Sequence, residues 1–133
     1  MGPRMKRLLY SSVAAGGTTT RDVMDVITSS ERNNPRRDLT GFLIYDRDRF
    51  LQLLEGPALE VEALMATIEN DTRHEAIEVL LEETAGKRWF PDWSMKRLIT
   101  FGSVPAQEEL SSILAGEEEG RRVLSEVNRF LEA

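Results

Sequence analysis

The sequence predicts an α+β domain, because short β-rich runs alternate with two amphipathic helical segments along the 133-residue chain. Two β-rich runs, 39–45 and 50–54, flank the short polar turn Asp46-Arg47-Asp48, which is the pattern of a hairpin. The order of the predicted elements is β-α-β-β-α-β-β. That order gives a ferredoxin-like, mixed five-stranded sheet with two helices on one face, followed by C-terminal helices.

The first strand is expected at 7–12, before the chain-breaking pair Gly16-Gly17. Thr18 to Thr20 offer N-cap hydroxyls for the first helix. One face of that helix carries Val23, Val26, Ile27 and Ser30. The helix is expected to end near 32–35, because Pro35 disfavours helical geometry in the residue before it.

The hairpin is expected to end at Glu55-Gly56-Pro57, and Pro57 suits the first turn of a second helix. This helix runs to about Asp71, and its apolar face is formed by Val61, Leu64, Met65 and Ile68. A strand at 76–84, a loop at 86–92 and a strand at 93–101 follow. Beyond Pro105, the segments 108–114 and 120–131 are predicted helices that pack on the outer face of the sheet.

Length and charge bound the class of protein. We expect one folded domain at 1–104 with a helical extension at 105–133. The first part carries 14 basic and 16 acidic residues and the extension carries 3 and 7, so their net charges are −2 and −4. This acidic balance argues against direct nucleic-acid binding.

The residue types that are missing exclude further classes. The chain has no Cys and one His, which excludes a disulfide framework, a thiol nucleophile and a Cys-ligated or His-rich metal site. No apolar run approaches the ~18–20 residues of a membrane span, and no signal peptide follows the basic start. We therefore expect a cytoplasmic protein without a metal site or a membrane partner.

Gln52 and Tyr10 are the first candidates for a functional site. Gln52 interrupts the run 50–54, which is apolar on both faces and therefore predicts a central strand. A buried amide there needs partners for one acceptor and two donors. Tyr10 is expected to bury its ring, and a tyrosine bonded to this glutamine could pass a proton as an electron leaves. A satisfied core glutamine, a misjudged edge strand and an ordinary core tyrosine are the alternatives.

Three further pairs of residues admit a structural and a functional interpretation. Asn33 and Asn34 either cap the first helix or present amides to a planar heterocycle. Trp93 and Met95 alternate on the last strand and share a face, where core packing is the default. Arg73 and His74 either lie in a solvated turn or meet a phosphate.

Six motifs occur in order along the chain. They are Leu-Leu-Tyr-Ser-Ser (8–12), Ser-x-x-Arg-Asn-Asn-Pro (29–35), Leu-Thr-Gly (39–41), Phe-Leu-Gln-x-Leu-Glu-Gly (50–56), Asp-x-Arg-His (71–74) and Trp-Ser-Met (93–95). Together they resemble the BLUF family, the blue-light sensors using FAD, over roughly residues 5 to 100. The resemblance implies a flavin held between the two helices of the ferredoxin-like sheet, as FAD or alternatively as FMN or riboflavin.

The resemblance also implies roles by position. Val26 and Ile68 would flank the flavin ring, and Asn34 would bond its carbonyl side with Asn33 assisting. Gln52 would lie between Tyr10 and the flavin N5/O4 edge, while Arg73 and His74 would lie near the ribityl-phosphate end. The implied flavin-binding residues are thus Val26, Asn33, Asn34, Phe50, Gln52, Ile68, Arg73 and His74.

The implied function is that of a blue-light photoreceptor and not of an enzyme. Excitation would move an electron and then a proton from Tyr10 through Gln52, and recombination would leave Gln52 rotated or tautomerised in a red-shifted state. Trp93 and Met95 would relay this state through the last strand and the C-terminal helices. The receiver would be a separate, unidentified signalling protein, and a homo-oligomer, either a dimer or a larger ring, is expected.

Three other functions are weighed against this one. RNA binding on the sheet would need an aromatic platform, which the strands lack. A small flavoenzyme would need a substrate domain and an acid–base pair, and neither is evident. A flavin-free interaction module is opposed by the presence of Tyr10, Asn34 and Gln52.

Overall fold

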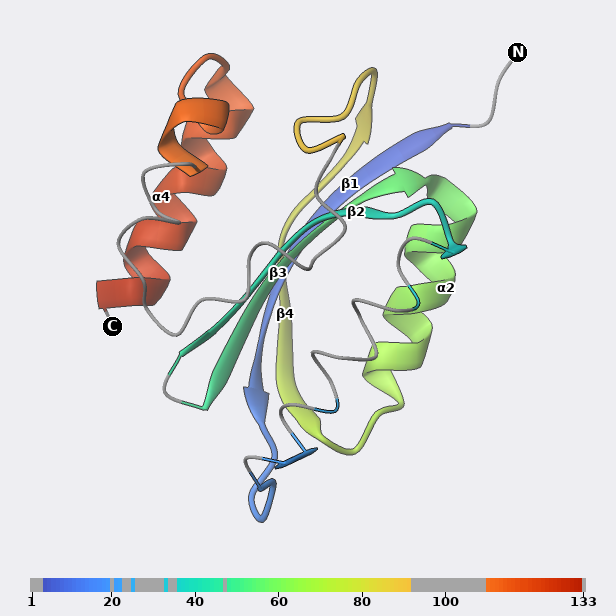
Figure 1. Cartoon of the computed structure of the whole chain (residues 1–133), viewed down its shortest axis with the longest axis vertical. Coiled ribbons are helices and arrows are strands. Elements are labelled where there is room, and N and C mark those ends of the chain that lie inside the picture. Colours follow the sequence, from blue (N-terminus) through green and yellow to red (C-terminus); the bar gives the residue numbers. More distant parts are fainter. Residues whose placement is uncertain are drawn as a thin grey trace.

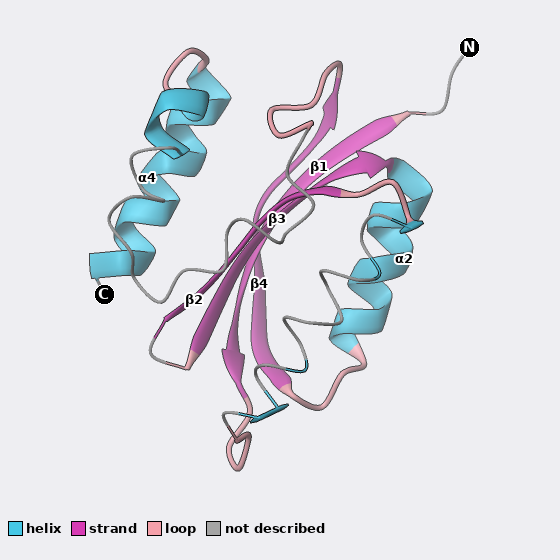
Figure 2. Cartoon of the chain, in the orientation of Figure 1, coloured by secondary structure: helices cyan, strands magenta, loops and turns pink. Residues whose placement is uncertain are grey.

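The computed structural model describes residues 4–19, 21–22, 25, 33, 36–46, 48–91 and 110–132. The elements in chain order are β1 (Met5–Ala14), β2 (Thr40–Asp46), β3 (Arg49–Pro57), α2 (Ala58–Glu69), β4 (His74–Ala85) and α4 (Glu118–Glu132). A short helical segment at 110–114 precedes α4. The sheet lies between α2 and α4, which cover its opposite faces (Figures 1 and 2).

The four described strands form one sheet in the order β2-β3-β1-β4. The predicted hairpin is confirmed as β2 and β3, which pair from Thr40 opposite Glu55 to Asp46 opposite Arg49. Every described pair of strands is antiparallel. A mixed sheet would therefore require the predicted fifth strand at 93–101, which lies outside the described residues.

The central position of β3 confirms the prediction made from its uninterrupted apolar run. β3 lies between β2 and β1, and residues 50–56 are all buried. Side chains alternate between the two faces of a strand, and here each face is covered by a helix. This double covering explains why the run 50–54 shows no alternation of polar and apolar residues.

Two hydrophobic clusters form the core. The α2-face cluster consists of Leu8, Tyr10, Leu39, Leu43, Phe50, Leu54, Val61, Met65 and Ile68. The α4-face cluster consists of Leu9, Phe42, Ile44, Leu51, Leu53, Leu81, Phe90, Leu110, Leu114, Val123, Val127 and Phe130. The C-terminal helices therefore pack on the sheet as the sequence predicts.

α2 matches the second predicted helix closely. It begins directly after Pro57, whose φ of −54° is the value that the proline ring imposes. It buries Val61, Met65 and Ile68 against the sheet. At its end, Asn70 Nδ2 donates a hydrogen bond to the Ala66 carbonyl oxygen at 2.9 Å, which satisfies a carbonyl of the last turn.

The first predicted helix falls mostly outside the described residues, but its start is described. The Asp22 N–H donates to Thr19 Oγ1 at 3.1 Å, and the Thr19 N–H donates to Asp22 Oδ2 at 3.0 Å. This reciprocal pair is a capping box. Thr19 is therefore the N-cap among the three threonines that the sequence offers.

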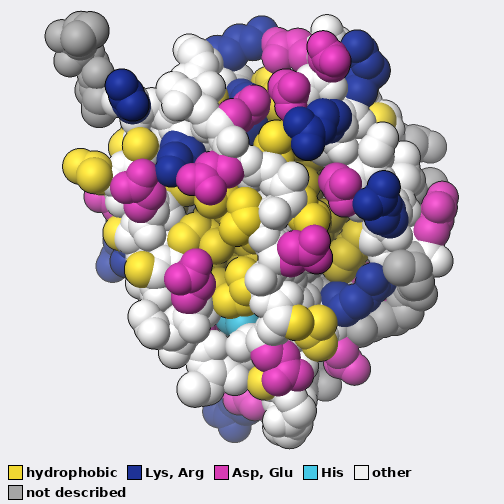
Figure 3. Space-filling model, turned by 180° about the vertical axis from the view of Figure 1, so that it is seen from behind, with side chains coloured by type: hydrophobic (Ala, Val, Ile, Leu, Met, Phe, Trp, Pro, Cys, Tyr) yellow, Lys and Arg dark blue, Asp and Glu magenta, His cyan; other side chains and the backbone are white. Residues whose placement is uncertain are grey.

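The side of the molecule seen in Figure 3 shows hydrophobic side chains gathered over the sheet, with charged side chains around them. A groove of ≈ 220 Å³ between α2 and β4 has Leu8, Met65 and Val79 in its lining. Val79 is 45% exposed. Among the described helices, none combines the length and the apolar character needed to cross a membrane.

Candidate functional site

Tyr10 and Gln52 lie opposite each other on the neighbouring strands β1 and β3. Both are almost completely buried, with exposed fractions of 1% and 2%. The Tyr10 hydroxyl donates a hydrogen bond to Gln52 Oε1 at 2.5 Å. The structure thus brings together the two residues that the sequence singles out, in the contact that proton transfer between them requires.

The direction of this hydrogen bond follows from the protonation state of Tyr10. Burial, with a smaller contribution from the charge of Asp71, raises the pKa of Tyr10. The phenol is therefore neutral and donates, so Gln52 accepts through its carbonyl oxygen while Nε2 carries the two donor hydrogens. An electron taken from Tyr10 would make the phenol strongly acidic, and its proton could then move along this hydrogen bond.

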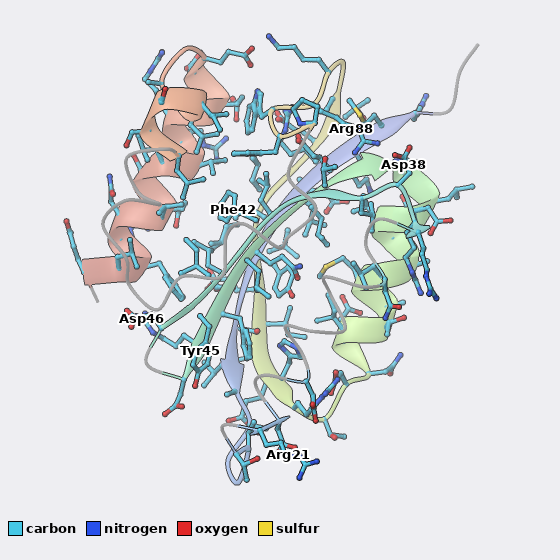
Figure 4. The ribbon with its side chains drawn as sticks, viewed as in Figure 1. Arg21, Asp38, Phe42, Tyr45, Asp46 and Arg88 are labelled. Carbon is cyan, nitrogen blue, oxygen red and sulfur yellow. The ribbon has the colours of Figure 1, made fainter. Side chains whose placement is uncertain are left out.

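The surroundings of the pair are apolar. Phe50 and Ile68, two of the predicted pocket residues, belong to the same α2-face cluster and are 0% and 8% exposed. Tyr45, which Figure 4 labels on β2, packs against Phe50 with ring centroids 5.1 Å apart. A hydrogen bond in such surroundings is stronger than one in water.

His74 begins β4 and lies buried beside Phe50. Its Nδ1 is 2.9 Å from Ser12 Oγ, and its ring centroid is 4.7 Å from that of Phe50. The exposed fraction of His74 is 8%. The structure therefore connects His74 to the α2 face through Phe50, whereas the sequence allowed a solvated turn.

Arg73 is bound to a neighbouring carboxylate. Its Nε lies 3.0 Å from Asp71 Oδ1 and its Nη2 lies 2.7 Å from Asp71 Oδ2. The hydrogen bond to Asp71 raises the pKa of Arg73, and the charges of Asp25 and Asp22 act in the same direction. A phosphate group at this turn would have to compete with Asp71 for the guanidinium.

Of the remaining predicted residues only Asn33 is described, and it is not part of this buried group. Asn33 is exposed, and its backbone carbonyl accepts a hydrogen bond from the Arg37 N–H at 3.3 Å. Four others lie outside the described residues: Val26, Asn34, Trp93 and Met95. Of the predicted site residues, the structure thus brings together Tyr10, Gln52, Phe50, Ile68 and His74.

A family model described as "Sensors of blue-light using FAD" matches residues 5–96, more than half of the chain. The chain belongs to the BLUF family. BLUF domains bind FAD and sense blue light with it. The matched residues include β1, β2, β3, α2 and β4 and therefore every described residue of the buried group.

Two curated relatives are much longer proteins. The blue light- and temperature-regulated antirepressor BluF of Escherichia coli (strain K12) is 32% identical over 83 residues, which are 62% of this chain and 21% of that protein. Photoactivated adenylate cyclase subunit alpha of Euglena gracilis is 28% identical over 95 residues, which are 70% of this chain and 9% of that protein. The matched region is thus about a fifth or less of each of these two relatives.

Two solved structures match the chain over nearly its whole length. The dark-state structure of BlrB, a BLUF protein, has a TM-score of 0.70 at 28% identity and covers 95% of this chain and 99% of that chain. The photo-activated state of BlsA has a TM-score of 0.71 at 25% identity and covers 97% of this chain and 96% of that chain. The α+β fold with its antiparallel sheet is therefore a BLUF fold.

The types of residue on this face of the sheet suit a flavin. A flavin ring is flat, with apolar faces and with carbonyl and nitrogen groups along its edges. Aliphatic side chains of α2 such as Val61 and Ile68 suit the faces, and the buried amide of Gln52 suits the polar edge. Gln52 and Ile68 are the described residues that would hold the ring from β3 and from α2.

Acid is expected to destabilise this BLUF domain through His74, the single histidine of the chain. Burial lowers the pKa of His74 from its ordinary 6.5, the charge of Asp71 opposes this effect, and Arg73 adds to it. The unfolded chain therefore takes up the proton at a higher pH than the folded chain does. The folded state consequently loses stability as the pH falls below the pKa that His74 has in the unfolded chain.

Denaturant unfolding at about pH 7.5 and about pH 5.5 tests this prediction, because the window spans the histidine titration. The loss of unfolding free energy on acidification should be smaller in His74→Gln than in the natural chain. An equal loss in both proteins would show that His74 does not cause the pH dependence.

Sequence reasoning missed three residues that the structure places at or behind the site: Ser12, Arg7 and Glu55. Ser12 contacts His74, and Arg7 and Glu55 form a buried ion pair at 3.3 Å. A signal for the pair exists in the sequence. Glu55 directly follows an apolar run that predicts a buried strand, and Arg7 is the basic residue in the first predicted strand.

Proposed function

We propose that this BLUF chain is a blue-light sensor whose light-sensitive element is the hydrogen bond between Tyr10 and Gln52. The observation that carries the proposal is the 2.5 Å contact between the Tyr10 hydroxyl and Gln52 Oε1, made by two buried side chains on adjacent strands. A bound flavin supplies a strong one-electron oxidant when it absorbs blue light.

Tyr10 gives up an electron and then its proton, which moves along the hydrogen bond to Gln52. Gln52 would pass this proton to the flavin that accepted the electron, and its amide would rotate or tautomerise while the Tyr10 hydroxyl no longer donates to it. Tyr10 then recovers both the electron and the proton, so nothing is oxidised or reduced overall. The rearranged Gln52 would then donate a new hydrogen bond to the C4 carbonyl of the bound flavin, which would move the absorption to the red.

Burial explains why a rearranged Gln52 would persist. The side chain is 2% exposed, so water cannot replace a lost hydrogen bond and each orientation needs its own protein or flavin partners. Two orientations of the Gln52 amide can each make all of its hydrogen bonds, but the orientations between them leave some of these hydrogen bonds unmade. A barrier of this kind is what a switch with two lasting states requires.

For the output, we propose a sensor rather than an enzyme, read by a separate protein. The state of Gln52 would pass through Trp93 and Met95 on a fifth strand of a ferredoxin-like sheet and then to the C-terminal helices. The described order β2-β3-β1-β4 and the packing of α4 on the sheet support this arrangement. A homo-oligomer, either a dimer or a larger ring, and a separate signalling partner remain predictions.

Absorption spectroscopy of the purified protein supplied with FAD tests the proposed function. The protein should be yellow, and blue light should shift its flavin spectrum reversibly to the red. Protein that stays colourless after supplementation would favour an interaction module, and bleaching that depends on an added substrate would favour an enzyme. Bound flavin without a light-induced shift would contradict the proposal.

A further inference from the structure

Glu55 is a completely buried carboxylate on the central strand, three residues beyond Gln52, with an exposed fraction of 0%. It accepts hydrogen bonds from the backbone N–H groups of Phe90 at 2.6 Å and of Trp89 at 3.0 Å. Both donors belong to residues 86–91, the segment that follows β4, which we call the 86–91 loop. A side chain of β3 thus holds this loop by its backbone.

Arg7 on β1 holds the same loop from a second side. Its Nε is 3.3 Å from Glu55 Oε2, and its Nη2 donates to the Lys87 carbonyl oxygen at 2.7 Å. The guanidinium carbon lies 3.4 Å from the centroid of the Trp89 ring. Charge-assisted hydrogen bonds and a cation–π contact therefore fix the loop against β1.

Arg88 ties the loop to the start of β2. Its Nη1 donates to Thr40 Oγ1 at 2.8 Å and to the Glu55 carbonyl oxygen at 3.1 Å. Its Nη2 lies 3.1 Å from Asp38 Oδ2, and Figure 4 shows Arg88 and Asp38 at the same end of the molecule. The loop is thus attached to the three adjacent strands β2, β3 and β1.

The same loop also holds the start of α4. Trp89 Nε1 donates to Glu117 Oε2 at 3.0 Å, and Lys87 Nζ lies 2.6 Å from Glu117 Oε1. The Glu117 carbonyl oxygen accepts the Arg121 N–H at 2.9 Å, so Glu117 is the N-cap residue that directly precedes α4. The loop is therefore a physical connection between the strand that carries Gln52 and the C-terminal helix.

We propose that Glu55 is a positioning residue that couples β3 to α4 through the 86–91 loop, so that a rearrangement of Gln52 changes how firmly α4 is held. This inference rests on the proposed function, because it needs a light-driven change at Gln52. It adds a second route to the one through Trp93 and Met95. Its described part runs from Glu55 to Trp89 and then to Glu117.

Geometry and burial explain why Glu55 can serve this purpose. Three residues of an extended strand span ~10 Å, and β3 is hydrogen-bonded on both sides, so a displacement at Gln52 reaches Glu55 along a stiff element. The carboxylate has no contact with water, so a shift cannot be absorbed by solvent replacing its partners. If the carboxylate shifts, the backbone N–H groups of Trp89 and Phe90 must either move with it or lose their hydrogen bonds to it.

Glu55→Gln tests the coupling, because it keeps the shape of the side chain but replaces one acceptor oxygen with a donor. Amide hydrogen exchange of the FAD-loaded full chain is measured in the dark and under blue light. We expect the natural chain to show a light-induced change of exchange in α4. In Glu55→Gln the flavin red shift should be retained and the change in α4 should be lost.

Glu62→Gln is the matched control. It makes the same chemical change at a side chain that is 54% exposed and paired with Lys6 at 3.0 Å, away from the loop. It should retain both the red shift and the response of α4.

Trp89→Phe keeps the proposal testable if Glu55→Gln fails to fold. It preserves an aromatic ring beside Arg7 but removes the N–H donor to Glu117. This variant should also keep the red shift and lose the response of α4.

Two results would overturn the coupling. One is a folded Glu55→Gln or Trp89→Phe variant that retains the red shift and shows the same response of α4 as the natural chain. The other is a natural chain that shows the red shift without any change of exchange in α4. A natural chain without a red shift would instead refute the proposed function.

Discussion

Tyr10→Phe is expected to abolish the light-induced red shift while the protein stays folded and binds flavin. The phenylalanine ring fills the same place in the α2-face cluster, but the hydroxyl that donates to Gln52 Oε1 at 2.5 Å is lost. Neither the proton nor its path to Gln52 then remains. Loss of this hydrogen bond should lower the unfolding free energy by about 1–3 kcal/mol. The light-minus-dark absorption spectrum and denaturant unfolding measure the two effects.

Tyr45→Phe is the matched control for this prediction. It removes the same hydroxyl group from a tyrosine that packs on Phe50 and donates to Asp48 Oδ1 at 2.9 Å. Because that hydroxyl bonds a carboxylate outside the Tyr10–Gln52 pair, Tyr45→Phe should keep the full red shift. A full red shift in Tyr10→Phe would disprove the role of the Tyr10 proton.

Truncation after Val104 is expected to abolish cooperative folding rather than to remove the output alone. The removed segment includes Leu110, Leu114, Val123, Val127 and Phe130, which are all buried in the α4-face cluster. Without them the sheet would expose Phe42, Leu51 and Leu53 to water. The yield of soluble protein and the unfolding transition measure this effect, and an unchanged unfolding midpoint would contradict it.

Phe130→Ala is a milder version of the same experiment. The Phe130 side chain is buried, and the Arg49 guanidinium carbon lies 4.5 Å from its ring centroid. The substitution should lower the unfolding free energy by about 3–5 kcal/mol, as for other buried phenylalanines. Ser125→Ala, at an exposed position of α4, is the control and should leave the unfolding free energy nearly unchanged.

Local sequence patterns predicted the elements of this structure that are determined by residues close together in the sequence. The polar turn between two β-rich runs predicts β2 and β3, and the apolar run around Gln52 predicts a central strand. The Tyr10–Gln52 contact could also be anticipated. Both residues interrupt buried strands with polar groups that need a partner, and the pairing of β1 with β3 places them opposite each other.

Long-range pairing decided the features that sequence reasoning missed. His74 is buried because β4 pairs with β1 and places it beside Ala14, near Ser12, which the turn sequence alone does not reveal. Glu55 is satisfied by backbone groups 34 and 35 residues away in the chain. The start of β4 was also missed: the strand begins at His74 and not at Ala76, and in this part Ala76 has a φ of 51° and the pairing with β1 shifts register between Ser11 and Val13.

The central claim is that the buried hydrogen bond between Tyr10 and Gln52 is the light-sensitive element of this BLUF domain. The most direct test is the light-minus-dark absorption spectrum of Gln52→Leu, recorded beside the natural chain with the same FAD content and the same illumination. We predict a reversible red shift in the natural chain and none in Gln52→Leu, although both bind flavin. A red shift of equal size in Gln52→Leu would contradict the claim.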